Sequence, residues 1–302
     1  METKTPLRIK SITEGHRLAK LPKPHHPLIS VVDVSELTRD AGVTAVVFDF
    51  YTISLKRGCD TLFYGQQQYD FDEGIMGFTA PGQILRGDAS DSAHRLEGWM
   101  LFIHPDFLWN TPLAKKIRQY EFFGYSAHEA LFLSDKEETL INSIVDHIKQ
   151  EYHSSIDKFS QDVIVAQLEL LFTYAQRFYE RQFITRKITN SKVLDRLEQV
   201  LTDYFNQEDL LLKGLPKVQD IADTLHMSTK YLSSLLKQHT GQTTQQHIHH
   251  KLIEKAKEML STTDLSVSEI AYELGFEHSQ SFSKLFKTKT KQSPLEFRQC
   301  FN

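Results

Sequence analysis

Cysteine is nearly absent from this sequence of 302 residues. The two thiols, Cys59 and Cys300, are too few for a disulfide framework or for a zinc site built from thiolates. Long apolar runs are also missing, because no stretch approaches the roughly 18 residues that span a bilayer. The N-terminal segment METKTPLRIK lacks the apolar core of a signal peptide. These absences argue against a secreted or membrane-spanning protein, and we expect a cytoplasmic protein with reduced thiols.

The sequence also lacks a net positive charge, since it has 35 lysines and arginines and 39 aspartates and glutamates. The charge is uneven, with a net −7 over residues 1–212 and a net +3 over residues 213–302. Attraction of a phosphate backbone must therefore come from local clusters and not from a basic domain as a whole. One such cluster is Lys284, Lys287, Lys289 and Lys291. A solvated helix end is the alternative interpretation of this cluster.

One pattern occurs twice near the C-terminus. In each copy, apolar residues spaced by three and four lie on either side of a short break, which is typical of two helices joined by a tight turn. The offset between the copies is 49 residues before the break and 50 after it. The first copy carries Ile221, Ala222, Leu225 and Met227, then Leu232, Leu235, Leu236, Lys237 and Thr240; the second carries Ile270, Ala271, Leu274 and Phe276, then Phe282, Leu285, Phe286, Lys287 and Thr290. The pattern predicts two helix-turn-helix motifs, at about residues 217–239 and 266–288.

The residues at the breaks agree with tight turns. Ser228 can cap the following helix with its hydroxyl group, and Gly275 can adopt the positive φ that ends the preceding helix in copy two. In a helix-turn-helix, the second helix lies in the DNA major groove and presents polar side chains away from its apolar stripe. The expected DNA-binding residues are Lys230, Ser233, Ser234 and Lys237 in copy one and Ser279, Gln280, Ser283, Lys284 and Lys287 in copy two.

The segment between the copies also bears on DNA binding. Residues 243–260 contain no glycine or proline and carry an apolar stripe, so they predict one helix of 18 residues. Such a helix is about 27 Å long, whereas successive major-groove faces lie about 34 Å apart. One chain could therefore place two helices in adjacent segments of the groove. Three histidines on this helix, His247, His249 and His250, lack the partners of a tetrahedral metal site.

At these residues the chain resembles the AraC/XylS family of bacterial transcription regulators. The stretch from Asp264 to Arg298 is similar to the signature second helix-turn-helix of the family, and Ile221 to Gly241 is similar to the first. The resemblance covers roughly the last 110 residues. One departure is Lys291, because the family pattern and copy one, at Gly241, have glycine there. This departure bears on where the second reading helix ends.

The resemblance implies a regulator that binds promoter DNA, with RNA polymerase as a partner and activation as the commoner outcome. It also implies which side chains face base edges: Lys230, Ser233, Ser234, Ser279, Gln280, Ser283 and Lys284. Of these, Gln280 is the clearest reader, since its amide can form two hydrogen bonds with adenine. No enzymatic activity and no cofactor are expected.

The N-terminal part reads as short strands separated by turns. The predicted strands are Leu28–Val34, Ala45–Leu55, Thr61–Tyr64, Gln67–Phe71, Ile75–Thr79 and Leu96–Ile103. Six short strands at this spacing predict a small antiparallel barrel or jelly roll. Many relatives of the resembled family carry a cupin-like effector domain in this position, and the resemblance therefore implies one here.

A metal enzyme of the cupin type is the alternative from another class. Metal-binding cupins use a His-x-His pair, a carboxylate and a third histidine, but no His-x-His pair precedes residue 247. The four histidines of interest, His25, His26, His94 and His104, lack this spacing. We expect no metal, and a small-molecule effector would meet apolar and aromatic walls. The candidate wall residues are Phe48, Phe50, Tyr64, Phe78 and Trp99, with Arg57 and Arg86 for an anionic ligand; core positions and surface charge are the alternative interpretations.

Helices are expected after residue 104. The predicted ranges are Pro105–Trp109, Leu113–Phe123, Ser134–Tyr152 with a capping box at Ser134 and Glu137, Gln161–Phe183, and Ser191–Asn206 after a short polar linker, Thr185–Asn190. The stripe of Gln161–Phe183, which includes Leu168 and Leu171, is wide enough for two partners. It predicts either a homodimer interface or an intramolecular core.

The sequence thus predicts an α+β protein of two domains. Residues 1–188 form a cupin-like β-barrel or jelly roll with a helical extension, for effector sensing and dimerisation. Residues 189–302 form an all-α DNA-binding domain of the AraC type. The predicted function is a sequence-specific, effector-responsive transcriptional activator. A constitutive DNA-binding protein whose barrel only dimerises is the third alternative; the effector and the target promoters stay unidentified.

Overall fold

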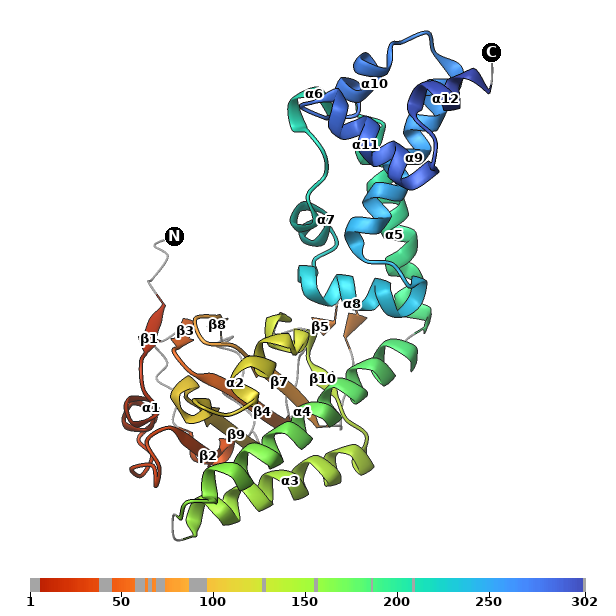
Figure 1. Cartoon of the computed structure of the whole chain (residues 1–302). Helices are drawn as coiled ribbons and strands as arrows, with labels where there is room; N and C mark the ends of the chain where they lie inside the picture. Colours follow the sequence, from red (N-terminus) through yellow and green to blue (C-terminus); the bar gives the residue numbers. More distant parts are fainter. Residues whose placement is uncertain are drawn as a thin grey trace. The chain divides into compact units, whose positions relative to one another are not determined.

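The computed structural model describes residues 6–37, 45–57, 63–64, 67–68, 74–86, 97–126, 129–154, 157–185, 187–207 and 210–300. The chain divides into two compact units, Met1–Gln182 and Phe183–Asn302 (Figure 1). The described part of the first unit contains sheets and helices, and that of the second contains helices alone. The α+β class with an N-terminal sheet region and a C-terminal helical part is therefore confirmed.

The first unit is built on a five-stranded antiparallel sheet in the order β10-β7-β4-β9-β2. Its strands are β2 (Ile29–Asp33), β4 (Tyr51–Arg57), β7 (Ile75–Thr79), β9 (Glu97–Ile103) and β10 (Leu131–Phe132). A second sheet has the order β1-β3-β8, formed by β1 (Leu7–Ile9), β3 (Ala45–Phe48) and β8 (Ile84–Arg86). The short strands β5 (Phe63–Tyr64) and β6 (Gln67–Gln68) pair with each other. Helix α1 (Ile12–Leu18) follows β1.

One predicted strand, Ala45–Leu55, is wrong because the chain changes sheets within it. β3 belongs to the three-stranded sheet, while β4 lies in the centre of the five-stranded one. At the change, the backbone N–H of Asp49 donates to the Ile9 carbonyl at 3.0 Å, and Phe50 is 1% exposed. Phe50 packs in a core cluster with Ile9 and Phe102. The change of sheet between β3 and β4 therefore places Phe48 and Phe50 against the core that the two sheets share.

The predicted helix Leu113–Phe123 is also wrong. The structure has only a short α2 (Leu113–Lys116) and then two 3₁₀ turns, η4 (Ile117–Gln119) and η5 (Glu121–Gly124). Phe122 and Phe123 are 3% and 4% exposed. Because neighbouring side chains of an α-helix point about 100° apart, a helix on the surface of the unit would expose one of the two. The 3₁₀ turns bury both rings, which contact Phe78 of β7 at centroid distances of 4.4 and 5.7 Å.

Helices α3 (Asp135–His153) and α4 (Ser160–Thr185) complete the first unit. The predicted capping box is confirmed, since Ser134 and Glu137 close the first turn of α3. On α4, Leu168 and Leu171 are fully buried within the single chain. These two leucines are therefore intramolecular core and are covered without a second subunit.

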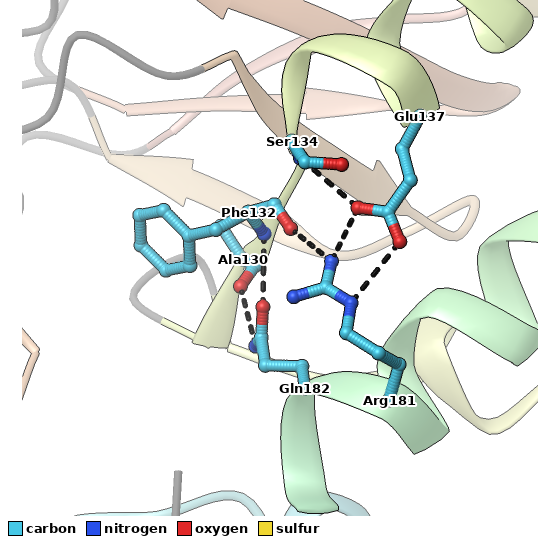
Figure 2. A network of polar contacts seen from close by, with 6 residues as sticks. All are labelled: Ala130, Phe132, Ser134, Glu137, Arg181 and Gln182. Atoms are coloured by element: carbon cyan, nitrogen blue, oxygen red, sulfur yellow. Dashed lines mark hydrogen bonds and ion pairs between the residues drawn. The ribbon is translucent and has the colours of Figure 1, made fainter. Parts of the chain in front are cut away.

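The end of α4 is fastened to the sheet by side-chain hydrogen bonds (Figure 2). The amide of Gln182, which is 1% exposed, accepts from the Phe132 N–H at 2.9 Å and donates to the Ala130 carbonyl at 3.2 Å. Arg181 donates to the Phe132 carbonyl at 2.7 Å and to both carboxylate oxygens of Glu137. Gln182 thus pairs with the edge strand β10 as a neighbouring strand would, and satisfies backbone groups that an edge leaves open.

The polar linker predicted at Thr185–Asn190 is wrong in its conformation. Helix α4 continues to Thr185, and helix α5 (Lys187–Phe205) begins two residues later. The segment TRKITN is polar but contains no glycine or proline, so a helix can extend into it from either side. Along α5, Val193, Leu197, Leu201 and Phe205 are buried at helical spacing.

The second unit then continues through seven further helices of the described residues. They are α6 (Leu210–Lys213), α7 (Val218–Thr224), α8 (Thr229–Thr240), α9 (Thr244–Thr262), α10 (Val267–Glu273), α11 (Ser279–Thr290) and α12 (Pro294–Gln299). Helix α9 contacts α5, α8, α10 and α12, so it is the central helix of the unit (Figure 1). Within the described ranges, no helix is both long and apolar enough to cross a bilayer.

Candidate nucleic-acid interface

Two pairs of helices correspond to the two copies of the sequence repeat. In the first pair, α7 and α8, the Ser228 hydroxyl accepts from the backbone N–H of Tyr231 at 3.2 Å, which caps α8 as the sequence predicts. In the second pair, α10 and α11, Gly275 has the predicted positive φ, 85°. His226, 49 residues earlier, has a φ of 58°. The residue at this position of the repeat therefore has a left-handed conformation in both turns, although it is glycine only in the second pair.

The two second helices end in the same way. A left-handed residue follows each, Gly241 with a φ of 73° after α8 and Lys291 with a φ of 66° after α11. The N–H of each bonds the carbonyl four residues back, Lys237 at 3.0 Å and Lys287 at 2.9 Å. The lysine at position 291 therefore does not shift the end of α11, although a side chain is disfavoured in this conformation.

Lys291→Gly is expected to stabilise α11 by about 1 kcal/mol, because glycine adopts the left-handed conformation without steric strain. Amide hydrogen exchange of α11 in the whole chain measures this change. Lys289→Gly is the matched control, since Lys289 lies inside the helix, where glycine costs about 1 kcal/mol. Equal protection in Lys291→Gly and the parent would show that the lysine carries no strain here.

The predicted DNA-binding residues of copy one lie on one face of α8. Tyr231, Leu232, Leu235 and Leu236 face the core and are at most 1% exposed. Lys230 and Lys237 are exposed, and Ser233 and Ser234 are partly exposed. The Ser234 hydroxyl donates to the Lys230 carbonyl at 3.0 Å, so its proton is engaged within the helix. This face presents two cations at its ends and small polar groups between them.

The predicted residues of copy two occupy the corresponding face of α11. Phe282 and Phe286 are fully buried on the opposite side. Gln280, Lys284 and Lys287 are exposed, and Ser279 and Ser283 are partly exposed. The offset of 50 residues aligns Gln280 with Lys230, Lys284 with Ser234 and Lys287 with Lys237. Each pair thus offers an unburied polar face with two lysines, one of them near its C-terminal end, and the second face also carries the Gln280 amide.

Helix α9 joins the two pairs and begins with a capping box formed by Thr243 and Gln246. Its 19 residues correspond to a length of about 28 Å. Burial lowers the pKa of His247 and of His249, and the Lys289 charge lowers that of His249 further. Burial therefore favours the neutral form of both rings. His247 contacts the Thr240 hydroxyl at 2.9 Å and His249 contacts the Gln245 amide at 3.0 Å.

The candidate effector residues of the first unit lie mainly in the core. Phe50, Phe78 and Trp99 are at most 6% exposed, and Phe48 is partly buried beside Phe50. Arg57 donates from Nε and Nη2 to the two carboxylate oxygens of Glu138, at 2.8 and 2.9 Å. Its charge is therefore already paired. The side chains of Tyr64 and Arg86 lie outside the described residues.

A groove of about 770 Å³ lies beside this ion pair, where β4 and β9 face α3. Its lining includes Trp99, whose indole N–H donates to Asn142 at 2.8 Å, and the carboxylates of Glu97 and Asp146. Within the ranges that the structure describes, no three side chains of histidine, cysteine, aspartate or glutamate are grouped to hold a metal ion. Cys300 is exposed, while Cys59 and His94 lie outside those ranges.

Sequence reasoning missed the contacts that hold the two helix pairs together. Gly214, before α7, lies against Gly275 in the turn of the second pair, and the Tyr204 hydroxyl donates to the Gly214 carbonyl at 3.0 Å. It also missed the left-handed His226, although the 49-residue offset aligns His226 with Gly275. That alignment is the signal that could have found it.

Known proteins match the second unit. A family model described as a helix-turn-helix domain matches residues 221–299. The HTH-type transcriptional activator RhaS of Enterobacter sp. (strain 638) is 34% identical over 136 residues, which are 45% of this chain and 46% of RhaS. The chain therefore spans about half the length of the curated relatives that it matches.

Two solved structures are also similar to parts of this chain. The C-terminal domain of AraT, a response regulator from Geobacillus stearothermophilus, is 30% identical and covers 36% of this chain and 84% of its own, with a TM-score of 0.32. ToxT from Vibrio cholerae O395 is 12% identical and covers 84% of this chain and 90% of its own, with a TM-score of 0.31.

Proposed function

We propose that this chain, which is a member of the AraC/XylS family of regulators through its C-terminal unit, is a sequence-specific, DNA-binding transcriptional activator. One observation carries the proposal: α8 and α11 each bury one side and present an unburied face of donors and cations on the other. We further propose that the two helix pairs are two helix-turn-helix motifs. The site residues are Lys230, Ser233, Ser234, Lys237, Ser279, Gln280, Ser283, Lys284 and Lys287.

The dimensions of the unit support two reading helices in adjacent groove segments. Helix α9, about 28 Å long, lies between the helix pairs, and successive major-groove faces are about 34 Å apart. The geometry thus allows contact with two segments on one side of the duplex. Selection of binding sites from random DNA by the whole chain tests this proposal. Enrichment of two short motifs about one helical turn apart is expected, and recovery of unselected sequence contradicts sequence-specific binding.

We propose that the first unit is a cupin-like barrel that senses a small-molecule effector, with its boundary near residue 188. The two sheets support this, because Ile9 of β1, Val32 of β2 and Phe102 of β9 share one core cluster. An effector that changes the affinity for the selected DNA supports the sensor. An affinity that no ligand alters favours the alternative, a constitutive regulator whose first unit only dimerises.

A homodimer through the outer face of α3 and α4 is part of this proposal. Leu170 is 43% exposed there and borders a groove of about 470 Å³ with Leu140 and Tyr174. Among the described residues, the buried Oε1 of Gln167 in the same groove has no hydrogen-bond partner. The exposed apolar surface of Leu170 in this groove is suited to contact with a second copy of the chain.

Activation, with RNA polymerase as partner, is proposed because the matched RhaS proteins are named transcriptional activators. A cytoplasmic location is proposed with it, since a promoter-binding protein acts on chromosomal DNA. Those relatives are regulators and not enzymes. A metal enzyme of the cupin type would instead be shown by stoichiometric iron, manganese or zinc in a protein that heparin does not retain.

Lys287→Ala is expected to weaken binding to specific and non-specific DNA alike and to reduce the salt slope by about one unit, because one phosphate contact is lost. Fluorescence anisotropy across a series of salt concentrations measures the slope. Lys255→Ala is the control, since the Lys255 ammonium pairs with Glu258 at 3.0 Å. A slope that falls equally in both variants would reflect net charge and not a contact at Lys287.

A further inference from the structure

The connection before the first helix pair touches the turn of the second pair, backbone against backbone. A Cβ atom at Gly275 would lie 2.8 Å from the Gly214 carbonyl carbon and 3.0 Å from its oxygen. Real side chains do not approach backbone so closely, so only glycine fits at this position. Gly275 also needs its positive φ for the turn between α10 and α11. Gly275 therefore has to be glycine for two separate reasons, the close contact with Gly214 and the positive φ.

The other side of this contact is held by hydrogen bonds. The Gly214 N–H donates to the Leu210 carbonyl at 2.8 Å, and the Gly214 carbonyl accepts from the Tyr204 hydroxyl at 3.0 Å. Tyr204 lies on α5, which contacts both α7 and α9. We name Tyr204, Gly214 and Gly275 the glycine junction. It fixes the backbone of position 214 between α5 and the turn of the second helix pair.

The glycine junction is a second link between the two helix pairs. Helix α9 is the first, because the chain runs through it from α8 to α10. The junction joins the segment that enters α7 to the turn that enters α11, and α6 packs on α10 beside it (Figure 1). With one link, the pairs could swing about the ends of α9. With two, a change in their separation must also break the contact between Gly214 and Gly275.

We propose that Tyr204, Gly214 and Gly275 are positioning residues that set the spacing of the two DNA half-sites read by α8 and α11. The inference rests on the proposed function of the two helices. None of the three residues needs to touch DNA, because they act by holding the helix pairs at one separation. A rigid pair of reading helices gains affinity from both half-sites only at the matching spacing.

The test uses the whole chain and a series of DNA duplexes. The half-sites found by selection are placed at their selected spacing and with one to five base pairs added or removed. For the parent, a shift of about half a helical turn is expected to cost about 100-fold in affinity, since the second helix no longer reaches its half-site. For Gly275→Ala and Tyr204→Phe, we expect the loss to be about tenfold or less, because the pairs can then adjust to the new spacing.

Gly241→Ala is the matched control for Gly275→Ala. Gly241 has a φ of 73°, close to the 85° of Gly275, but a Cβ atom there meets nothing within 4 Å. Gly241→Ala introduces similar backbone strain but breaks no contact. Its affinity is therefore expected to depend on half-site spacing as that of the parent does. Tyr204→Phe keeps the aromatic ring and removes only one hydroxyl group. This variant still tests the inference if circular dichroism shows that Gly275→Ala does not fold.

The outcomes separate the inference from the function on which it rests. A flattened spacing profile in Tyr204→Phe, with parental affinity for a single half-site, supports the glycine junction as a positioning device. A parental profile in Tyr204→Phe and in folded Gly275→Ala overturns it and leaves DNA binding by α8 and α11 intact. A parent that selects no DNA sequence overturns the proposed function, and the inference with it.

Discussion

Leu168→Asp is expected to unfold the N-terminal unit, whereas Leu170→Asp is expected to leave it folded and monomeric. The two leucines are two residues apart on α4, but Leu168 is fully buried and Leu170 is 43% exposed. A charge at position 168 would lose the packing of a buried leucine and lie unpaired in the core, a cost of about 5 kcal/mol or more. At position 170, the same charge would face the proposed partner.

The measurement uses residues 1–188, which retain the bonds of Arg181 and Gln182 to β10 and α3. Circular dichroism reports the fold, and sedimentation at micromolar concentration reports the mass. Gln176→Asp is the control for an added charge, because Gln176 is exposed and lies about 120° around α4 from Leu170. A folded Leu170→Asp fragment that is still dimeric would remove this face of α4 from the interface.

The C-terminal helices could be predicted closely because the signals that set them are local. Thr243 and Gln246 start α9 with a capping box, and Ser228 caps α8, each within four residues of chain. The apolar residues at three and four then define the buried face. The glycine junction could not be predicted in this way. Gly214 and Gly275 are distant in sequence, and nothing in the local pattern indicates that their backbones touch.

The N-terminal unit was less predictable because sheet pairing is not local. β1 pairs in parallel with β3, so the chain between them carries α1 and a strand of the other sheet. The alternation of apolar and polar residues along Ala45–Leu55 does not show at which residue the chain passes from one sheet to the other. The same limit applies to Arg57, since its bidentate pairing with Glu138 joins residues 81 positions apart. A candidate anion-binding arginine could be recognised as paired only once α3 was placed against β4.

Gln280→Ala is expected to relax base preference at one half-site and to cost about 1 to 3 kcal/mol there, because one amide can make two hydrogen bonds to adenine. Gln280 is exposed on α11 at the position that Lys230 occupies on α8. A lysine ammonium is a point charge, whereas an amide presents a donor NH2 group and an acceptor oxygen side by side in one plane. Discrimination between bases should therefore be stronger at the half-site read by α11.

Affinities for a set of duplexes with every base substituted in turn measure this preference. At the position read by Gln280, the parent should lose about 10- to 100-fold on substitution of the preferred base, and Gln280→Ala should lose little. Gln199→Ala is the control, since the Gln199 amide already bonds Asp203 on α5 at 2.7 Å and should leave every preference unchanged. Because phosphate contacts carry no sequence information, a uniform loss over all duplexes would place Gln280 against the backbone. An unchanged profile would show that the exposed face of α11 does not enter the groove.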